Sequence, residues 1–108
     1  MDDDQNLQSI MGLIVNGGNA KSSSMEAIQA AKTGDFDGAD AKLKEADAAL
    51  SEAHNSQTSM LTKEASGDHV KVTLLMVHSQ DHLMNAITFR DLAGEIVDLY
   101  RKLAKEGK

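Results

Sequence analysis

The sequence predicts an all-α protein, an antiparallel bundle in which three helices run up, down and up. None of its 108 residues is proline, so no residue of that type interrupts a long helix. The composition is 41% hydrophobic and rich in alanine and methionine, which favour helices. Aromatic residues supply only 3% of the chain, which argues against a β-sandwich core. A chain of this length forms at most one domain, so residues 1–108 are expected to fold as a unit.

The first helix is expected over about residues 5–32, because apolar residues recur there every three or four positions. Acidic residues at positions 2–4 complement the positive end of this helix, and Gly34 can end it in the left-handed conformation. The pair Gly17 and Gly18 lies inside the helix, where each glycine costs on the order of 1 kcal/mol relative to alanine. The pair therefore marks a bend, a close approach of another helix or a tolerated defect.

The second and third helices follow after short connections. The second is expected over about residues 35–61, with Asp35 as its N-cap and an alanine-rich apolar face that lets helices approach closely. The next connection spans residues 63–68, and Asp68 can cap a third helix over about residues 69–105. Connections this short favour antiparallel neighbours.

Charge and composition disfavour several classes of function. Seventeen acidic residues against 11 basic ones give a net charge of -6, which disfavours duplex nucleic acid and anionic membranes as partners and suits a basic protein. Without cysteine, the chain has no disulfide, no thiolate metal site and no cysteine nucleophile. No apolar run reaches the roughly 18 residues of a membrane span, so the protein is expected to be soluble and cytoplasmic, with no direct membrane insertion.

Residues 76–84 contain the candidate functional site, because two histidines and a carboxylate interrupt the most apolar stretch of the sequence there. At about 100° per residue, His78, Asp81 and His82 share one face of the third helix. The four apolar residues at 74–77 run almost completely round the helix, which is more apolar surface than one neighbouring helix covers. The site is therefore expected to lie between several helices.

Residue types leave three chemistries open for these side chains. His78 and His82, four residues apart, can chelate a transition metal, with Asp81 as an oxygen ligand. The pattern is similar to the inverted zinc-peptidase motif His-x-x-Glu-His, but aspartate replaces the catalytic glutamate and a small bundle offers no obvious substrate cleft. In the second alternative, a neutral imidazole of His78 attacks a phosphoryl donor. In the third, the histidines are structural polar groups on a partly buried helix.

A phosphoryl group on His78 needs hydrogen-bond donors. His78 lies deep in the expected helix, too far from its N-terminus for that end to hold the phosphate, so Gln80 and His82 are the local candidates. Asp81 lies among apolar residues, where a carboxylate is costly unless it is paired or bound to a cation. A salt bridge, or a metal shared by symmetry-related copies at an oligomer axis, would compensate it.

Residues 77–84, Val-His-Ser-Gln-Asp-His-Leu-Met, resemble the active-site signature of a known family. This is the lactose/cellobiose class of enzyme IIA in the bacterial phosphoenolpyruvate-dependent sugar phosphotransferase system. Supporting matches lie in residues 11–16, 31–36 and 52–54, so the resemblance covers nearly the whole chain as a single enzyme IIA domain. One departure is Ser79, where the family is expected to have alanine or glycine, so that packing against a partner could differ.

The resemblance implies a homotrimer in which the third helices meet around a three-fold axis. His78 then accepts phosphate from HPr and passes it to a cysteine of enzyme IIB, with Gln80 and His82 in supporting roles. Asp81 of three chains binds a divalent cation, taken as Mg²⁺. The protein is then a phosphotransferase component without a sugar site of its own, serving uptake of cellobiose, chitobiose or lactose. The rival hypothesis is a non-catalytic, metal-linked helical oligomer or adaptor.

Overall fold

Three long helices account for almost all of the chain. The computed structural model describes the backbone of residues 2–107 and the side chains of residues 6–107. Helix α1 spans Asp2–Lys32, α2 spans Phe36–Ala65 and α3 spans Leu74–Glu106. Over the described backbone there is no strand, so the all-α prediction is confirmed. None of the three helices, over that same stretch, combines the length and apolar character that crossing a membrane requires.

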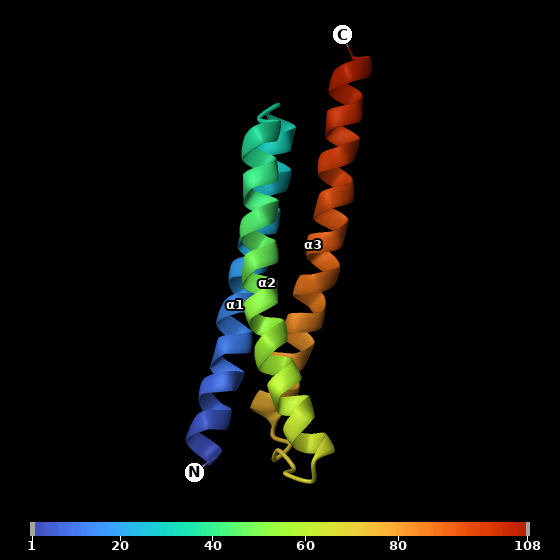
Figure 1. Ribbon diagram of the computed structural model, residues 1–108. Helices are drawn as coiled ribbons and strands as arrows, with labels where there is room; N and C mark the ends of the chain where they lie inside the picture. The colour runs from blue at the N-terminus through green and yellow to red at the C-terminus, as the bar shows by residue number, and fades with distance from the viewer. Residues whose placement is uncertain (1, 108) are drawn as a thin grey trace.

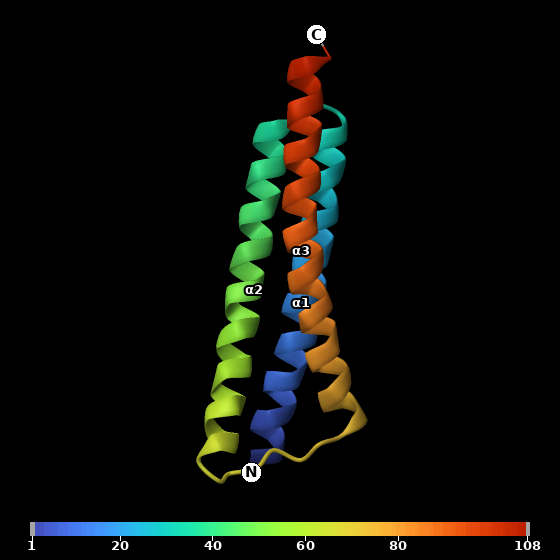
Figure 2. The same ribbon diagram turned by 90° about the vertical axis from the view of Figure 1, so that its right-hand side faces the viewer.

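The helices lie side by side in a rod with dimensions of 60 × 20 × 19 Å. Figure 1 shows the N-terminus and the α2–α3 connection at one end of the rod, and the α1–α2 connection at the other. Chain direction therefore alternates from one helix to the next. The view in Figure 2 shows that the C-terminal end of α3 extends past the α1–α2 connection. The last part of α3 therefore has no neighbouring helix from its own chain.

Helix α1 is continuous through Gly17 and Gly18, so this pair does not interrupt it. Gly34 follows the end of the helix, as predicted: its φ is +85°, and its N–H donates to the carbonyl of Ala31 at 3.1 Å. The acidic side chains at positions 2–4, which the sequence places at the positive end of the helix, lie outside the described side chains.

Helix α2 is capped by Asp35, as predicted, because its carboxylate accepts a hydrogen bond from the N–H of Gly38 at 2.9 Å. The helix continues to Ala65, past the predicted end near residue 61. Its buried side recurs every seven residues and is made of small or flexible side chains: Ala39, Ala46, Ala53 and Met60. Such a narrow stripe allows the close helix approach that the alanine content predicts.

Helix α3 begins at Leu74, so its predicted start at residue 69 is wrong. The N-cap is Thr73 and not Asp68. The hydroxyl of Thr73 accepts a hydrogen bond from the N–H of Met76 at 3.1 Å, which satisfies one of the free donors at the helix end. The residues from 68 to 73 form an irregular connection instead of the first turn of the helix.

Glu64 gives the physical reason for the later start. One of its carboxylate oxygens accepts a hydrogen bond from the N–H of Val70 at 3.2 Å, and the other pairs with the imidazole of His69. The hydrogen bond from His69, followed by that from Val70, lowers the pKa of the Glu64 carboxyl. Val70 also packs against the hydrophobic core. These contacts with α2 hold the connection in an irregular conformation and override the local capping signal.

The core changes in composition along the rod. Near the α2–α3 connection it contains mostly large side chains: Ile10, Leu13, Met60, Met76 and Leu83. In the middle it consists of alanine: Ala20, Ala46 and Ala86. At the other end, alanines surround Val97 and aromatic rings border it: Phe36 and Tyr100. The candidate histidines lie on α3 beside the first of these groups.

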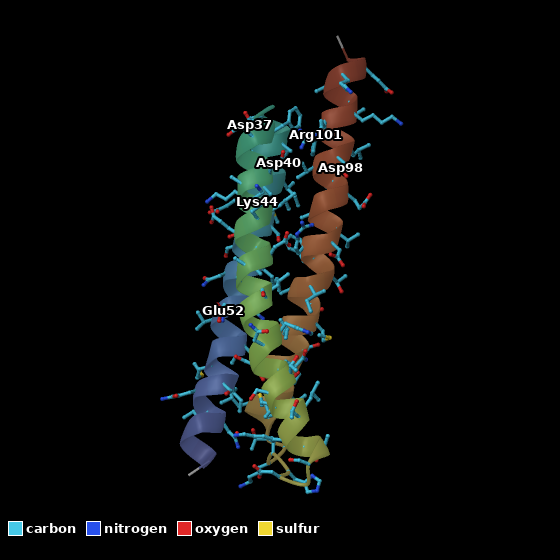
Figure 3. All side chains as sticks on the ribbon, viewed as in Figure 1. Asp37, Asp40, Lys44, Glu52, Asp98 and Arg101 are labelled. Carbon is cyan, nitrogen blue, oxygen red and sulfur yellow. The ribbon has the colours of Figure 1, made fainter. Side chains whose placement is uncertain are left out.

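Two ion pairs join α2 to α3 in the half of the rod away from the histidines. Asp47 accepts hydrogen bonds from Nε and Nη2 of Arg90 at 2.7 and 3.1 Å, and this contact raises the pKa of the guanidinium. Asp40 accepts one from Arg101 at 2.8 Å. The guanidinium of Arg101 also lies 5.0 Å from the ring centroid of Phe36. Figure 3 shows Arg101 and Asp40 close together between the two helices.

Candidate functional site

His78 lies near the start of α3 on its exposed side. Because the helix begins at Leu74, the imidazole is about one turn into it, and not deep within it as the predicted start implies. The depth of about ten residues, on which the exclusion of the helix N-terminus as a phosphate site depends, is therefore wrong. Since the side chain is exposed, a large donor molecule can reach its ring.

His82 lies one turn further along α3 and is half-buried. Its imidazole stacks on that of His78, with ring centroids 6.0 Å apart and planes inclined by 20°. The Cδ2 edge of the His82 ring faces α1 at Gly17, where an added Cβ atom would lie only 2.9 Å from Cδ2. The glycine pair is therefore a place of close helix approach, one of the alternatives that the sequence leaves open.

The two histidines do not converge on a metal within one chain. Across the described side chains, no group of three or more His, Cys, Asp or Glu residues is arranged to hold a metal ion. The geometry therefore does not support chelation by His78, His82 and Asp81 of a single chain.

Asp81 is exposed on the outer face of α3, the face turned away from α1 and α2. No basic side chain between residues 6 and 107 forms an ion pair with it, so the internal salt bridge considered from the sequence is absent there. Its neighbours one turn away in either direction are apolar: Val77 is 52% exposed and Met84 is 47% exposed. The carboxylate therefore lies exposed between apolar side chains of the outer face.

Gln80 points toward α2 and not toward His78. Its Oε1 accepts a hydrogen bond from the side-chain amide of Gln57 at 2.6 Å, and its own amide nitrogen lies 3.7 Å from the sulfur of Met76. Two positions apart on a helix, Gln80 and His78 lie on nearly opposite sides. Within one chain, the structure therefore brings His82 but not Gln80 to the candidate phosphate carrier.

Ser79 is fully buried and faces the core of its own chain. Its hydroxyl donates to the carbonyl of Met76 at 2.7 Å, so the polar group is satisfied within α3. The expectation that this serine changes packing against a partner is wrong, because no partner can reach it. A small side chain is needed here for packing inside the chain, and serine meets that need.

The outer face of α3 carries a row of exposed apolar side chains. They are 47 to 85% exposed and follow one another at helical spacings: Leu74, Val77, Met84, Leu92, Leu99 and Leu103. Asp81 lies on the same side of the helix. Only the beginning of the row stands out in the sequence, because charged residues between its later members conceal the pattern. Soluble monomers rarely expose such an extended apolar surface.

Comparison with known families agrees with the resemblance seen in the sequence. The family described as PTS system, Lactose/Cellobiose specific IIA subunit, matches residues 8–101. The lichenan-specific phosphotransferase enzyme IIA component of Bacillus subtilis (strain 168) is 52% identical over 99 residues, which cover 92% of this chain and 90% of that protein.

Solved structures show the same similarity. The crystal structure of the PTS cellobiose-specific enzyme IIA from Bacillus anthracis has a TM-score of 0.89 and 47% identity, covering 91% of this chain and 90% of that one. A chain in the solution structures of the Escherichia coli IIA(Chitobiose)-HPr complex has a TM-score of 0.78 and 40% identity, covering 90% of this chain and 94% of that one. The agreement in both sequence and fold extends over nearly the whole bundle.

Proposed function

The chain belongs to the lactose/cellobiose-specific IIA family of the sugar phosphotransferase system, and we propose that it carries a phosphoryl group on His78. One observation carries this proposal: the imidazole of His78 is exposed about one turn into α3 and stacks on a second imidazole. An exposed nucleophile beside a potential hydrogen-bond donor is what transfer between two proteins requires.

The transfer has two steps at the same ring. A nitrogen of neutral His78 attacks the phosphorus of phosphorylated HPr, and the P–N bond to the histidine of HPr breaks as the new P–N bond forms. A cysteine thiolate of enzyme IIB then attacks the phosphorus, and the bond to His78 breaks. The chain returns to its starting state, as a carrier must.

His82 is proposed to support the phosphorylated state directly. A ring N–H of His82 can donate to a phosphate oxygen, and its protonated form offsets part of the phosphate charge. The positive end of α3, about one turn away, favours the same charge. Gln80 is proposed to act through position, because its hydrogen bond to Gln57 holds α3 against α2 beside the site.

The outer face of α3 is proposed to be the centre of a homotrimer. Three copies meeting around an axis parallel to α3 would bury its row of exposed apolar side chains, among them Leu92 and Leu99. The same arrangement places three Asp81 carboxylates near one another. Carboxylate oxygens are the donors that Mg²⁺ takes, so a divalent cation, proposed to be Mg²⁺, fits this group of like charges.

The proposed partners are proteins, and the sugar is not selected here. The acidic chain, with a net charge of -6, suits a basic donor such as HPr, the protein found with the related chitobiose component. The relatives compared above are named for lichenan, cellobiose and chitobiose at similar identities, which argues that this bundle does not determine the sugar. We propose a β-linked disaccharide, with cellobiose first, carried by a membrane partner while this chain acts in the cytoplasm.

Intact mass spectrometry tests the carrier role. The protein is incubated with phosphoenolpyruvate, enzyme I and HPr, and is then exposed to mild acid. We expect one acid-labile phosphate on the wild type and none on His78→Ala. The matched control is His54→Ala, which removes an exposed imidazole from α2 and should leave the phosphate in place.

The same experiment judges the rival hypothesis of a non-catalytic, metal-linked oligomer or adaptor. In that case the wild type takes no phosphate, although it assembles normally in sedimentation. Phosphate that persists on His78→Ala would instead assign the carrier to another residue. Either result would overturn the proposed role of His78.

A further inference from the structure

We propose that Gly17 of α1 is a positioning residue for the phosphoryl site, because its missing side chain determines where the imidazole of His82 lies beside His78. The inference rests on the proposed phosphoryl transfer and extends it from α3 to a second helix. It concerns the position of a ring, and Gly17 itself does not touch the phosphate.

Gly17 and His82 lie closer together than any residue with a Cβ atom at position 17 would permit. Gly17 is buried, and an added Cβ would lie 2.9 Å from Cδ2, 3.4 Å from Nε2 and 3.7 Å from the carbonyl oxygen of His82. The close atoms belong to both the ring and the backbone, so α1 and α3 are near each other over the whole residue. A methyl group at this point forces the imidazole to move.

The His82 imidazole is positioned by packing and not by a side-chain hydrogen bond of the described residues. No side-chain hydrogen bond between residues 6 and 107 involves His78 or His82. His82 is therefore held by Gly17 at one edge and by the stacked ring of His78, with centroids 6.0 Å apart. A displacement of the His82 ring therefore changes its position relative to the His78 ring.

Helix α1 supplies matched control positions for this contact. A Cβ at Gly18 would lie 3.6 Å from Nε2 of His82, an ordinary van der Waals distance, and a Cβ at Gly12 would meet nothing within 4 Å. Alanine has the same intrinsic advantage over glycine at each of these helical positions. The differences among the three alanine variants therefore report the contact with His82 and not helix propensity.

The test compares Gly17→Ala, Gly18→Ala and Gly12→Ala with the wild type. Two quantities are measured: the rate of phosphoryl transfer from phosphorylated HPr, and the imidazole ¹H–¹⁵N resonances of His78 and His82 during a pH titration. For Gly17→Ala we expect both histidines to shift and the rate to fall roughly fourfold, in proportion to a displacement of a few tenths of an ångström. Gly12→Ala should match the wild type, and Gly18→Ala should lie between them.

A second comparison, made in protein that already carries His82→Ala, separates a positioning role of Gly17 from a general effect on the fold. When His82→Ala is already present, Gly17→Ala should cause no further loss of rate, because the ring that it displaces is gone. A loss of similar size in both backgrounds would overturn the proposal. So would His78 and His82 resonances in Gly17→Ala that coincide with those of Gly12→Ala.

Failure of the carrier role gives a different result from failure of this inference. If the wild type takes no phosphate, the proposed function is wrong, and the resonances still decide whether Gly17 positions His82. If the wild type takes phosphate at His78 and the three glycine variants behave alike, only the positioning role is wrong.

Discussion

The inner and outer faces of α3 differ in the size of their apolar side chains. Three of the five fully buried residues on the inner face are small, Ser79, Ala86 and Ala93, and the other two are Leu83 and Val97. Large apolar residues dominate the exposed outer face: Leu74, Leu92, Leu99 and Leu103. Small inner residues allow close approach of helices of the same chain, whereas large outer ones leave apolar area for another chain. The comparison agrees with the proposed trimer, in which α3 packs against helices of its own chain on one face and against other copies on the other.

Charged residues on the two faces support the same conclusion. Arg90 reaches across the inner side to Asp47 and is satisfied within the chain. Asp81, on the outer face, has no ion-pair partner among residues 6–107. Among these residues, the charge on the inner face is therefore paired within one copy, and the charge on the outer face is not.

The largest expected effect comes from Leu83→Ala, which removes the one large side chain that is fully buried on the inner face of α3. We expect the free energy of unfolding to fall by about 3 kcal/mol, since a buried leucine loses its transfer energy and leaves a cavity. Urea denaturation measures this change, which should be the same at every protein concentration. A loss below about 1 kcal/mol would mean that the inner face is loosely packed.

The same substitution on the outer face, Leu92→Ala, should instead weaken assembly. Leu92 is 55% exposed in one chain, so its full burial in a trimer is worth about 1 kcal/mol per chain. Sedimentation at a series of concentrations should show dissociation beginning at higher concentration than for the wild type. If the assembly is unchanged while unfolding weakens as much as for Leu83→Ala, the contrast between the two faces is wrong.

The sequence predicts those features of the fold that depend on neighbouring residues. Gly34 and Asp35 end one helix and cap the next as expected, because a left-handed glycine and an N-cap act within four residues. The start of α3 could not be predicted in the same way. It depends on Glu64 of α2 binding Val70, a contact across the connection that outweighs the capping signal of Asp68.

For the candidate site too, the sequence predicts contacts within one helix but not contacts between helices. Helical periodicity places His78 beside His82, and the structure stacks their rings. The glycine pair in α1 was visible as an anomaly, but a single sequence does not say which side chain lies against Gly17. The hydrogen bond between Gln80 and Gln57 also depends on the relative rotation of two helices, which periodicity within one helix does not determine.

Asp81→Leu tests the role of the one carboxylate discussed above among the apolar side chains of the outer face. In the proposed trimer, replacing the three clustered carboxylates by apolar side chains should keep the assembly or strengthen it, by about 1 kcal/mol per chain, because no cation is then needed. Sedimentation with and without a chelator measures the effect: wild-type assembly should weaken on chelation, and that of the variant should not. A variant that stays folded but still needs the cation would place Asp81 away from the axis.

Asp47→Asn tests the ion pair that Arg90, on the inner face of α3, forms with α2. The asparagine can still accept one hydrogen bond from Arg90, but the bidentate ion pair is lost. Because Asp47 is half-exposed, we expect a loss of only about 0.5 kcal/mol in the free energy of unfolding, and a smaller one in high salt. Assembly and phosphorylation should match the wild type. A change in assembly would mean that the two faces are not independent.

The smallest expected effect concerns Glu64, which contacts His69 and Val70 in the connection that leads into α3. The pKa of its carboxyl is lowered from the ordinary value of 4.5, mainly by the hydrogen bond with His69. A group whose pKa is lower in the folded state contributes stability above its unfolded pKa and loses it as pH falls through the folded value. Glu64→Gln should therefore lower the melting temperature slightly at neutral pH, and the difference from the wild type should shrink as the pH falls below about 4.5. Thermal melts from neutral to acidic pH provide the measurement.

Glu52→Gln, at an exposed position of α2, is the control and should show no such convergence. A difference that is constant over the whole range would mean that the charge of Glu64 does not hold the connection.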